Sequence, residues 1–218
     1  MSEARPRLVA LELAADPGAW RACGFTVDAG ARCRIGTTDV VLRAGAAAAG
    51  RAGILGWTVA GAIPADDGLD GLATAVAESD AAASAPAHLN GVIGIDHVVV
   101  STPDTARTFE ALEAAGFEVR GVRDAGTPER PLRQGFLLFA DVLLEVVGPP
   151  EPLEGTGGAP AAFWGVTLVA GDLDGAARAF GGHLGAPRDA VQAGRRIAVV
   201  AREAGLGARV ALMTPRGV

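Results

Sequence analysis

Two ionisable side chains lie inside apolar runs of the sequence, and they are the residues best placed to do chemistry. His97 lies in the run "IDHVVV", and Glu145 lies in the run "VLLEVV". An unpaired charge in an apolar interior costs several kcal/mol, so such groups need compensation. We therefore expect His97 and Glu145 to pair with each other, to line a wet cavity, or to bind a ligand.

Strands are predicted to position both side chains. The two runs are rich in β-branched and large apolar residues, which favours extended backbone. Because strand side chains alternate between two faces, Glu145 shares its face with Leu143 and Val147, and His97 shares its face with its second neighbours. The turn Ala140-Asp141 is too short for anything but a hairpin between the strands at 134–139 and 142–147.

A helix is predicted between the first strand and this hairpin. Thr102-Pro103 supplies a capping side chain followed by a proline suited to the first helical position. Ala106, Phe109 and Leu112 recur at helical spacing, and Gly116 ends the helix. The order is then strand, helix and three strands.

This order, with His in "IDHVVV" and Glu in "DVLLEVVGP", resembles one module of the vicinal oxygen chelate superfamily, which includes glyoxalases, extradiol dioxygenases and bleomycin-resistance proteins. The resemblance implies an α+β fold of repeated βαβββ modules. Two paired modules would form an eight-stranded curved sheet, a cup with its helices outside.

Two domains are expected from the repeats of this pattern. Residues 91–218 hold two whole modules, and the second has strands predicted at 164–169, 196–201 and 209–213 and a helix capped by Asp172. Residues 1–90 read as a degenerate glyoxalase-like region, with one module and then a strand and helix from Gly53 to Ala77. An Ala/Ser/Pro linker follows at 81–87, and we expect residues 91–218 to fold alone.

The resemblance implies that a metal is held at the first and last strands of both modules. His97 and Glu145 take these positions in the first module. In the second, Gly165 precedes Asp172 by the seven residues that separate His97 from Asp104, and matching "VLLEVVGP" to "VALMTPRG" sets Met213 opposite Glu145. Glycine offers no ligand atom, and a thioether suits hard or borderline divalent ions poorly.

Only two ligands therefore remain, whereas a catalytic metal normally has about three protein ligands. The sequence favours a protein without a cofactor, the alternative being one divalent metal ion on His97 and Glu145.

A small-molecule site is expected in the cup, because a concave apolar pocket with few polar groups is the usual ligand site. The predicted contacts are Phe136, Leu143, Val147, Trp164, Val166, Leu168 and Met213, with strand neighbours replacing them if the register slips by one.

Composition limits the classes of partner. The chain has 218 residues, 50% of them hydrophobic, and a net charge of −6, without any basic cluster, so neither nucleic acid nor an anionic membrane is an expected partner. All 19 basic residues are arginine and there is no tyrosine, which excludes lysine Schiff bases and P-loop lysines. We expect a cytoplasmic protein, because neither a signal peptide nor a membrane-length apolar run is evident. A homodimer is possible.

Further polar residues have structural interpretations. Adjacent Arg195 and Arg196 point to opposite faces, so one at most could meet an anionic ligand, and solvated positions are expected for both. His88, in the linker region, and His183, at a helix end, are also expected to be solvated.

Three functions follow from these observations. The first is a binding protein for an apolar small molecule without a complete metal site. The second is a lyase, isomerase or dioxygenase-like enzyme in which His97 and Glu145 bind a metal or act as acid and base. The third is a scaffold protein whose N-terminal half covers the cup or forms a dimer.

Overall fold

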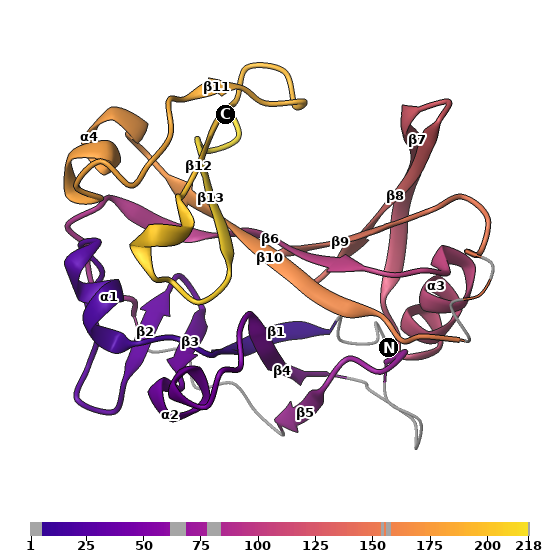
Figure 1. The fold of residues 1–218 in the computed structure, drawn as a ribbon, viewed down its shortest axis with the longest axis horizontal. Helices are drawn as coiled ribbons and strands as arrows, with labels where there is room; N and C mark the ends of the chain where they lie inside the picture. The colour runs from indigo at the N-terminus through magenta and orange to yellow at the C-terminus, as the bar shows by residue number, and fades with distance from the viewer. Residues whose placement is uncertain (1–5, 62–68, 78–83, 154, 156–157, 218) are drawn as a thin grey trace. The chain divides into compact units, whose positions relative to one another are not determined.

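The computed structural model describes residues 6–61, 69–77, 84–153, 155 and 158–217, and its strands form two sheets (Figure 1). The five-stranded sheet has the order β2-β3-β1-β4-β5 and comprises β1 (Arg7–Leu13), β2 (Arg32–Ile35), β3 (Thr38–Leu42), β4 (Ile54–Ala60) and β5 (Thr74–Ala77). The eight-stranded sheet has the order β11-β12-β13-β10-β6-β9-β8-β7 and comprises β6 (Val92–Ser101), β7 (Glu118–Thr127), β8 (Arg130–Leu138), β9 (Leu143–Gly148), β10 (Ala162–Ala170), β11 (Arg188–Asp189), β12 (Arg196–Val199) and β13 (Arg209–Met213).

Four α-helices lie among the described residues, α1 (Pro17–Ala22), α2 (Ala44–Ala48), α3 (Thr105–Ala114) and α4 (Leu173–Ala179). The chain order after β5 is β6-α3-β7-β8-β9 and then β10-α4-β11-β12-β13. Each half of the eight-stranded sheet is thus one βαβββ module, which confirms the predicted fold class. None of the helices in the described residues is both long enough and apolar enough to cross a membrane.

The chain divides into two compact units, and each combines one module with parts of the first ninety residues. One unit comprises residues 1–9, 56–80 and 97–164, and the other comprises residues 10–55, 81–96 and 165–218. We call them the first and the second unit. The domain boundary near Asn90 stays a prediction, and residues 81–83 of the predicted linker lie outside the described residues.

Aromatic packing forms much of the core of the first unit. The Trp57 ring is almost fully buried, and its centroid lies 6.2 Å from Phe117, 5.3 Å from Phe139 and 5.0 Å from Phe163. Such pairs contribute about 0.5–1.5 kcal/mol each beyond the area they bury. Trp57 on β4 therefore binds the strand to the module of the same unit.

A buried ion pair anchors the second unit, and it corrects the expectation that Arg195 is solvated. The side chains of Arg195 and Asp96 are each 4% exposed, and Arg195 Nη2 lies 2.5 Å from Asp96 Oδ1. Arg195 also donates to Gln192 Oε1 and to the Thr214 carbonyl oxygen. These acceptors compensate the guanidinium for lost hydration, which is why it can be buried.

Two predicted elements take other forms. Residues 69–77 were expected to be helical, but Asp70 and Gly71 both have positive φ, a tight turn follows Leu69, and Thr74–Ala77 pair with β4 as β5. Positive φ at successive residues is incompatible with a right-handed helix. The module in the first ninety residues also predicts a strand at 25–27, but these residues are irregular backbone.

The cap of α3 also differs from the prediction, because the helix begins two residues later than expected. Asp104, not Thr102, is the N-cap residue, and its side chain accepts a hydrogen bond from the Arg107 backbone N–H. Thr102 instead accepts from the Asp104 N–H, just outside the helix.

His88 is buried rather than solvated, which is a second correction. Its Nδ1 accepts a hydrogen bond from the Thr26 backbone N–H at 3.1 Å, and its Nε2 lies 3.0 Å from the Arg34 carbonyl oxygen. The ring also meets Phe25 edge-on. An Nδ1 that accepts and an Nε2 that donates define a neutral imidazole. Burial, the largest cause, lowers the pKa of His88, while the bond to Arg34 opposes the shift.

We expect His88 to make the protein less stable in acid. The unfolded-state pKa of histidine is about 6.5, so lowering the folded-state pKa gives stability that is complete above about pH 6.5 and is lost as pH falls toward the folded value. Urea unfolding at about pH 8 and about pH 5 should therefore show that His88→Gln costs about 1–3 kcal/mol at the higher pH, from its two hydrogen bonds, and less at the lower. His183→Gln, at a half-exposed position, is the control. An equal cost of His88→Gln at both pH values would contradict the expectation.

The domain boundary gives a further prediction. Because residues 91–218 contain two repeats of one element order, the fragment should unfold in a single cooperative thermal transition, measured by circular dichroism. Aggregation of the fragment would contradict the boundary and show that buried groups such as Trp57 belong to its core.

Candidate functional site

The first unit places His97 and Glu145 on one face of the strands β6, β9 and β8. His97 pairs with Leu143 in the parallel register of β6 and β9, and Glu145 pairs with Phe136 in the antiparallel register of β9 and β8. Residues directly opposite share a face, and their second neighbours follow them. The face therefore carries Leu143, Val147 and Phe136 together with the two ionisable groups, as the sequence predicted.

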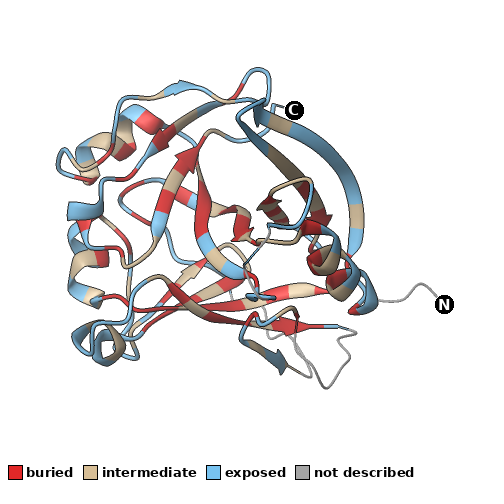
Figure 2. Cartoon of the chain, turned by 45° about the vertical axis from the view of Figure 1, so that its right-hand side comes forward, coloured by how far each residue is buried: buried red, intermediate tan, exposed pale blue. Residues whose placement is uncertain are grey.

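The opposite face of the same strands is closed by packing. Val98, Leu144 and Leu137 are fully buried, and buried residues alternate with less buried ones along β9 and the second half of β8. Figure 2 shows the burial of each described residue along the chain. A Cβ atom built on Gly135 would lie 2.2 Å from the Phe109 ring, so this glycine allows α3 to approach β8. One face is thus the helix-packed core, and the other keeps its side chains partly accessible.

A row of polar side chains crosses the accessible face. His97 Nε2 lies 3.5 Å from Glu145 Oε2, Gln134 Nε2 donates to Glu145 Oε1 at 2.6 Å, and Arg123 Nε donates to Gln134 Oε1 at 2.8 Å. The four residues come from the neighbouring strands β6, β9, β8 and β7. We call them the polar row.

Burial makes the contacts inside the polar row significant. The His97 and Glu145 side chains are only 12% and 13% exposed. Each carboxylate oxygen of Glu145 has one partner, so its charge is compensated in a partly dry environment. The pair can donate and accept protons or hydrogen bonds toward a bound molecule.

Gln134 and Arg123 were not among the predicted site residues. They lie directly opposite each other in the register of β7 and β8, and the Arg123 guanidinium carbon lies 5.4 Å from the centroid of the Phe136 ring. The available signal was cross-strand register, which is regular from the Thr127–Arg130 pair to this one, because the bulge between Val119 and Gly121 lies beyond it. Counting back from the turn after Thr127 identifies the pair, but this turn was not among the predicted elements.

The second module lacks ligand side chains at the equivalent positions. Asp104 and Asp172 are both N-caps, so Gly165 takes the place of His97, as expected. A Cβ atom on Gly165 would lie 2.6 Å from the Arg209 carbonyl oxygen. Close strand pairing therefore excludes a histidine there unless the backbone moves.

The match between Met213 and Glu145 is wrong by two residues. Glu145 pairs with Val99 of β6, whereas the equivalent residue of β10, Thr167, pairs with Ala211. Met213 pairs with Val169 and so lies on the same face as Thr167. The error came from equating Val142 with Val210, whereas the strand register makes Leu143 equivalent to Arg209.

The remaining predicted contacts lie on β10. Val166 and Leu168 are buried and pair with Val210 and Leu212, on the face opposite to Thr167 and Met213. In the second module, the face equivalent to that of Glu145 therefore carries the neighbours of Val166 and Leu168, not these two residues. Trp164 is 50% exposed. Whether any of these residues contacts a ligand stays a prediction.

The residues present do not fit the metal site that the fold family implies. His97 and Glu145 are two donors, and Gly165 and Ala211 supply no side-chain ligand. Among the described residues, no group of three or more His, Cys, Asp or Glu side chains is arranged to hold a metal ion. A catalytic metal normally needs about three protein ligands.

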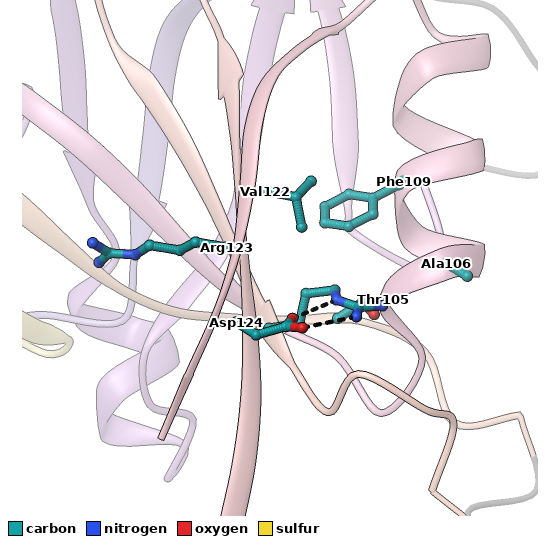
Figure 3. Close-up of a pocket in the computed structure, with 7 residues that line it drawn as sticks. Thr105, Ala106, Phe109, Val122, Arg123 and Asp124 are labelled. Carbon is teal, nitrogen blue, oxygen red and sulfur yellow. Dashed lines mark hydrogen bonds and ion pairs between the residues drawn. The ribbon is translucent and has the colours of Figure 1, made fainter. Parts of the chain in front are cut away.

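A pocket of about 300 Å³ lies between α3 and the β7–β8 hairpin. Phe109 and Val122 face each other in it, while Arg123 points away from them (Figure 3). At its edge Arg133 Nε donates to Asp124 Oδ1 at 2.8 Å, and this bond is the main cause of the lowered pKa of Asp124. Arg123, which lines this pocket, also belongs to the polar row.

Comparisons with known proteins were made by sequence and by structure. No protein-family model matches the sequence, and a search of curated proteins finds no match. A mutant of 4-hydroxymandelate synthase from Streptomyces coelicolor is similar in structure, with a TM-score of 0.62, 12% identity and coverage of 97% of this chain and 93% of that protein. A fusion of a xylose isomerase-like TIM barrel and 4-hydroxyphenylpyruvate dioxygenase has a TM-score of 0.61 at 10% identity, over 100% of this chain and 50% of the fusion.

Methylmalonyl-CoA epimerase from Mycobacterium tuberculosis matches 58% of this chain and 91% of its own, with a TM-score of 0.44 and 17% identity. The two similarities that span this whole chain agree with its repeated βαβββ order and its eight-stranded sheet. The chain therefore has the vicinal oxygen chelate fold.

Proposed function

We propose that the protein binds a mostly apolar small molecule on the accessible face of β6, β8 and β9. The observation that carries the proposal is the pairing of His97 with Glu145 among half-buried apolar neighbours, Phe136, Leu143 and Val147. Apolar walls supply most of the affinity of a small-molecule site, and a few convergent polar groups fix the orientation of the ligand.

The contrast between the two sheet faces supports this proposal. Packing fills the helix-side face, where Leu144 and Leu137 are fully buried. The other face leaves Leu143, Val147 and Phe136 only half-buried. Covering these side chains with an apolar molecule would remove further apolar surface from water, at about 25 cal/mol per Å².

A second candidate is acid–base catalysis at the same pair. Glu145 has its two oxygens held by Gln134 and His97, so a bound molecule would meet a fixed carboxylate beside an imidazole. Proton transfer needs such groups within hydrogen-bond reach of the substrate. Turnover of a bound compound that is lost in Glu145→Gln would favour this candidate.

We expect a thermal-shift screen of hydrophobic metabolites to find stabilising compounds. A compound at about 100 times its dissociation constant stabilises the native state by about 2.7 kcal/mol. Glu145→Gln should weaken a true hit, because it removes the charge while keeping the shape of the side chain. Glu113→Gln is the matched control, since Glu113 is exposed on α3.

The proposal would be contradicted by flat melting curves across a broad library. It would also be contradicted by hits that lose the same affinity in both variants, because such compounds would not use this face.

Metal content provides an independent prediction. With two donors where about three are normally needed, the purified protein should hold less than one divalent ion per chain after dialysis. Elemental analysis of wild type and His97→Ala measures this. One tightly held ion per chain that is lost in His97→Ala would support a metal-dependent enzyme instead.

A further inference from the structure

We propose that Arg123 recognises a carboxylate on the small molecule that binds beside the polar row. The inference rests on the proposed function and names the chemical class of the ligand, an apolar molecule with an anionic group at one end.

The Arg123 guanidinium is held in place before any ligand binds. Its Nε donates to Gln134 Oε1 at 2.8 Å, and its guanidinium carbon Cζ lies 5.4 Å from the centre of the Phe136 ring. Glu145 accepts from the amide nitrogen of Gln134, which turns the amide oxygen toward Arg123. An ordered guanidinium loses less conformational entropy when it binds an anion.

The terminal nitrogens of Arg123 distinguish it from nearby arginines. Arg107, Arg120 and Arg133 of the first unit form ion pairs with Asp70, Glu118 and Asp124 respectively. Across the described part of the chain, Arg123 has no such carboxylate partner. Its fixed Nε leaves both Nη groups available, and two parallel N–H groups suit a carboxylate.

Charge along the polar row sets the orientation of the ligand. Arg123 and Glu145 are two strands apart, about 10 Å at the usual spacing of neighbouring strands. An anionic end is attracted by Arg123 and repelled by Glu145, whereas a hydroxyl at the other end could donate to Glu145. Phe136 lies directly opposite Glu145 and Val147 lies directly opposite Gln134 in the strand register, so both flank these ends and suit a flat apolar body.

A matched pair of compounds tests the inference. The probes are a hydroxynaphthoate with hydroxyl and carboxylate at opposite ends of the ring system, and the neutral amide of the same compound. Isothermal titration at neutral pH should show the acid binding about tenfold more tightly than the amide to the wild type. Arg123→Gln should abolish this preference by weakening the binding of the acid about tenfold more than the binding of the amide.

Arg120→Gln is the matched control, because it removes the same charge from the same strand at a residue that is paired with Glu118. Loss of the preference in both variants would overturn the inference, since a general charge effect would explain it. If the wild type bound the acid and the amide equally, and Glu145→Gln weakened the binding of both, recognition of a carboxylate by Arg123 would be overturned. The same result would support the proposed binding site. If neither compound bound the wild type, the proposed class of ligand, an apolar carboxylate, would be overturned. If the thermal-shift screen also found no stabilising compound, the binding site itself would be overturned.

Discussion

The polar row depends on the strict alternation of side chains along β9. Leu144 and Val146 are fully buried on the helix side, and a shift of one residue would bring Glu145 into that core and expose its leucine neighbour. Burying a carboxylate without partners would cost several kcal/mol, so the register is strongly specified. The small residue Gly135 adds to this constraint, because Phe109 occupies the space above it and fixes the position of α3 on the sheet. The core on one face therefore determines the chemistry available on the other.

Polar groups are buried elsewhere in the chain, but there they have structural partners on every side. Arg195 meets Asp96, Gln192 and a backbone carbonyl, and His88 bridges the backbone of Thr26 and Arg34. These arrangements connect distant segments of the second unit. His97 and Glu145 differ because their side chains remain partly accessible on a face that also exposes apolar groups. Partial accessibility beside apolar surface, rather than burial alone, is what indicates a binding site.

The sequence was sufficient for the fold because its strongest signals are local and repeated. Apolar alternation, helix caps and the turn at Ala140-Asp141 predicted the modules and placed Glu145 on one face with Leu143 and Val147, whereas the strand register showed that His97 shares this face. The sequence was insufficient wherever the position of a residue depends on strand pairing with a distant segment of the chain. The partner of Arg123 follows from the turn after Thr127, which was not predicted, and the wrong match for Met213 came from equating Val142 with Val210. Residues 69–77 appeared helical because their apolar spacing fits a helix, yet positive φ at Asp70 and pairing with β4 make them extended.

The two modules differ in the side chains that they carry at these equivalent positions. In the first, His97 and Glu145 are supported by Gln134, whereas in the second Gly165 lies so close to the Arg209 carbonyl that even a Cβ atom would clash. Gly165 and Ala211 give the second module no side-chain donor, and close strand pairing occupies the space beside Gly165. Glu145 consequently has Gln134 and His97 as its partners, and these hold its two carboxylate oxygens in place. Gly165 and Ala211 thus weaken the case for a metal. The Glu145 carboxylate is then suited to direct contact with an organic molecule.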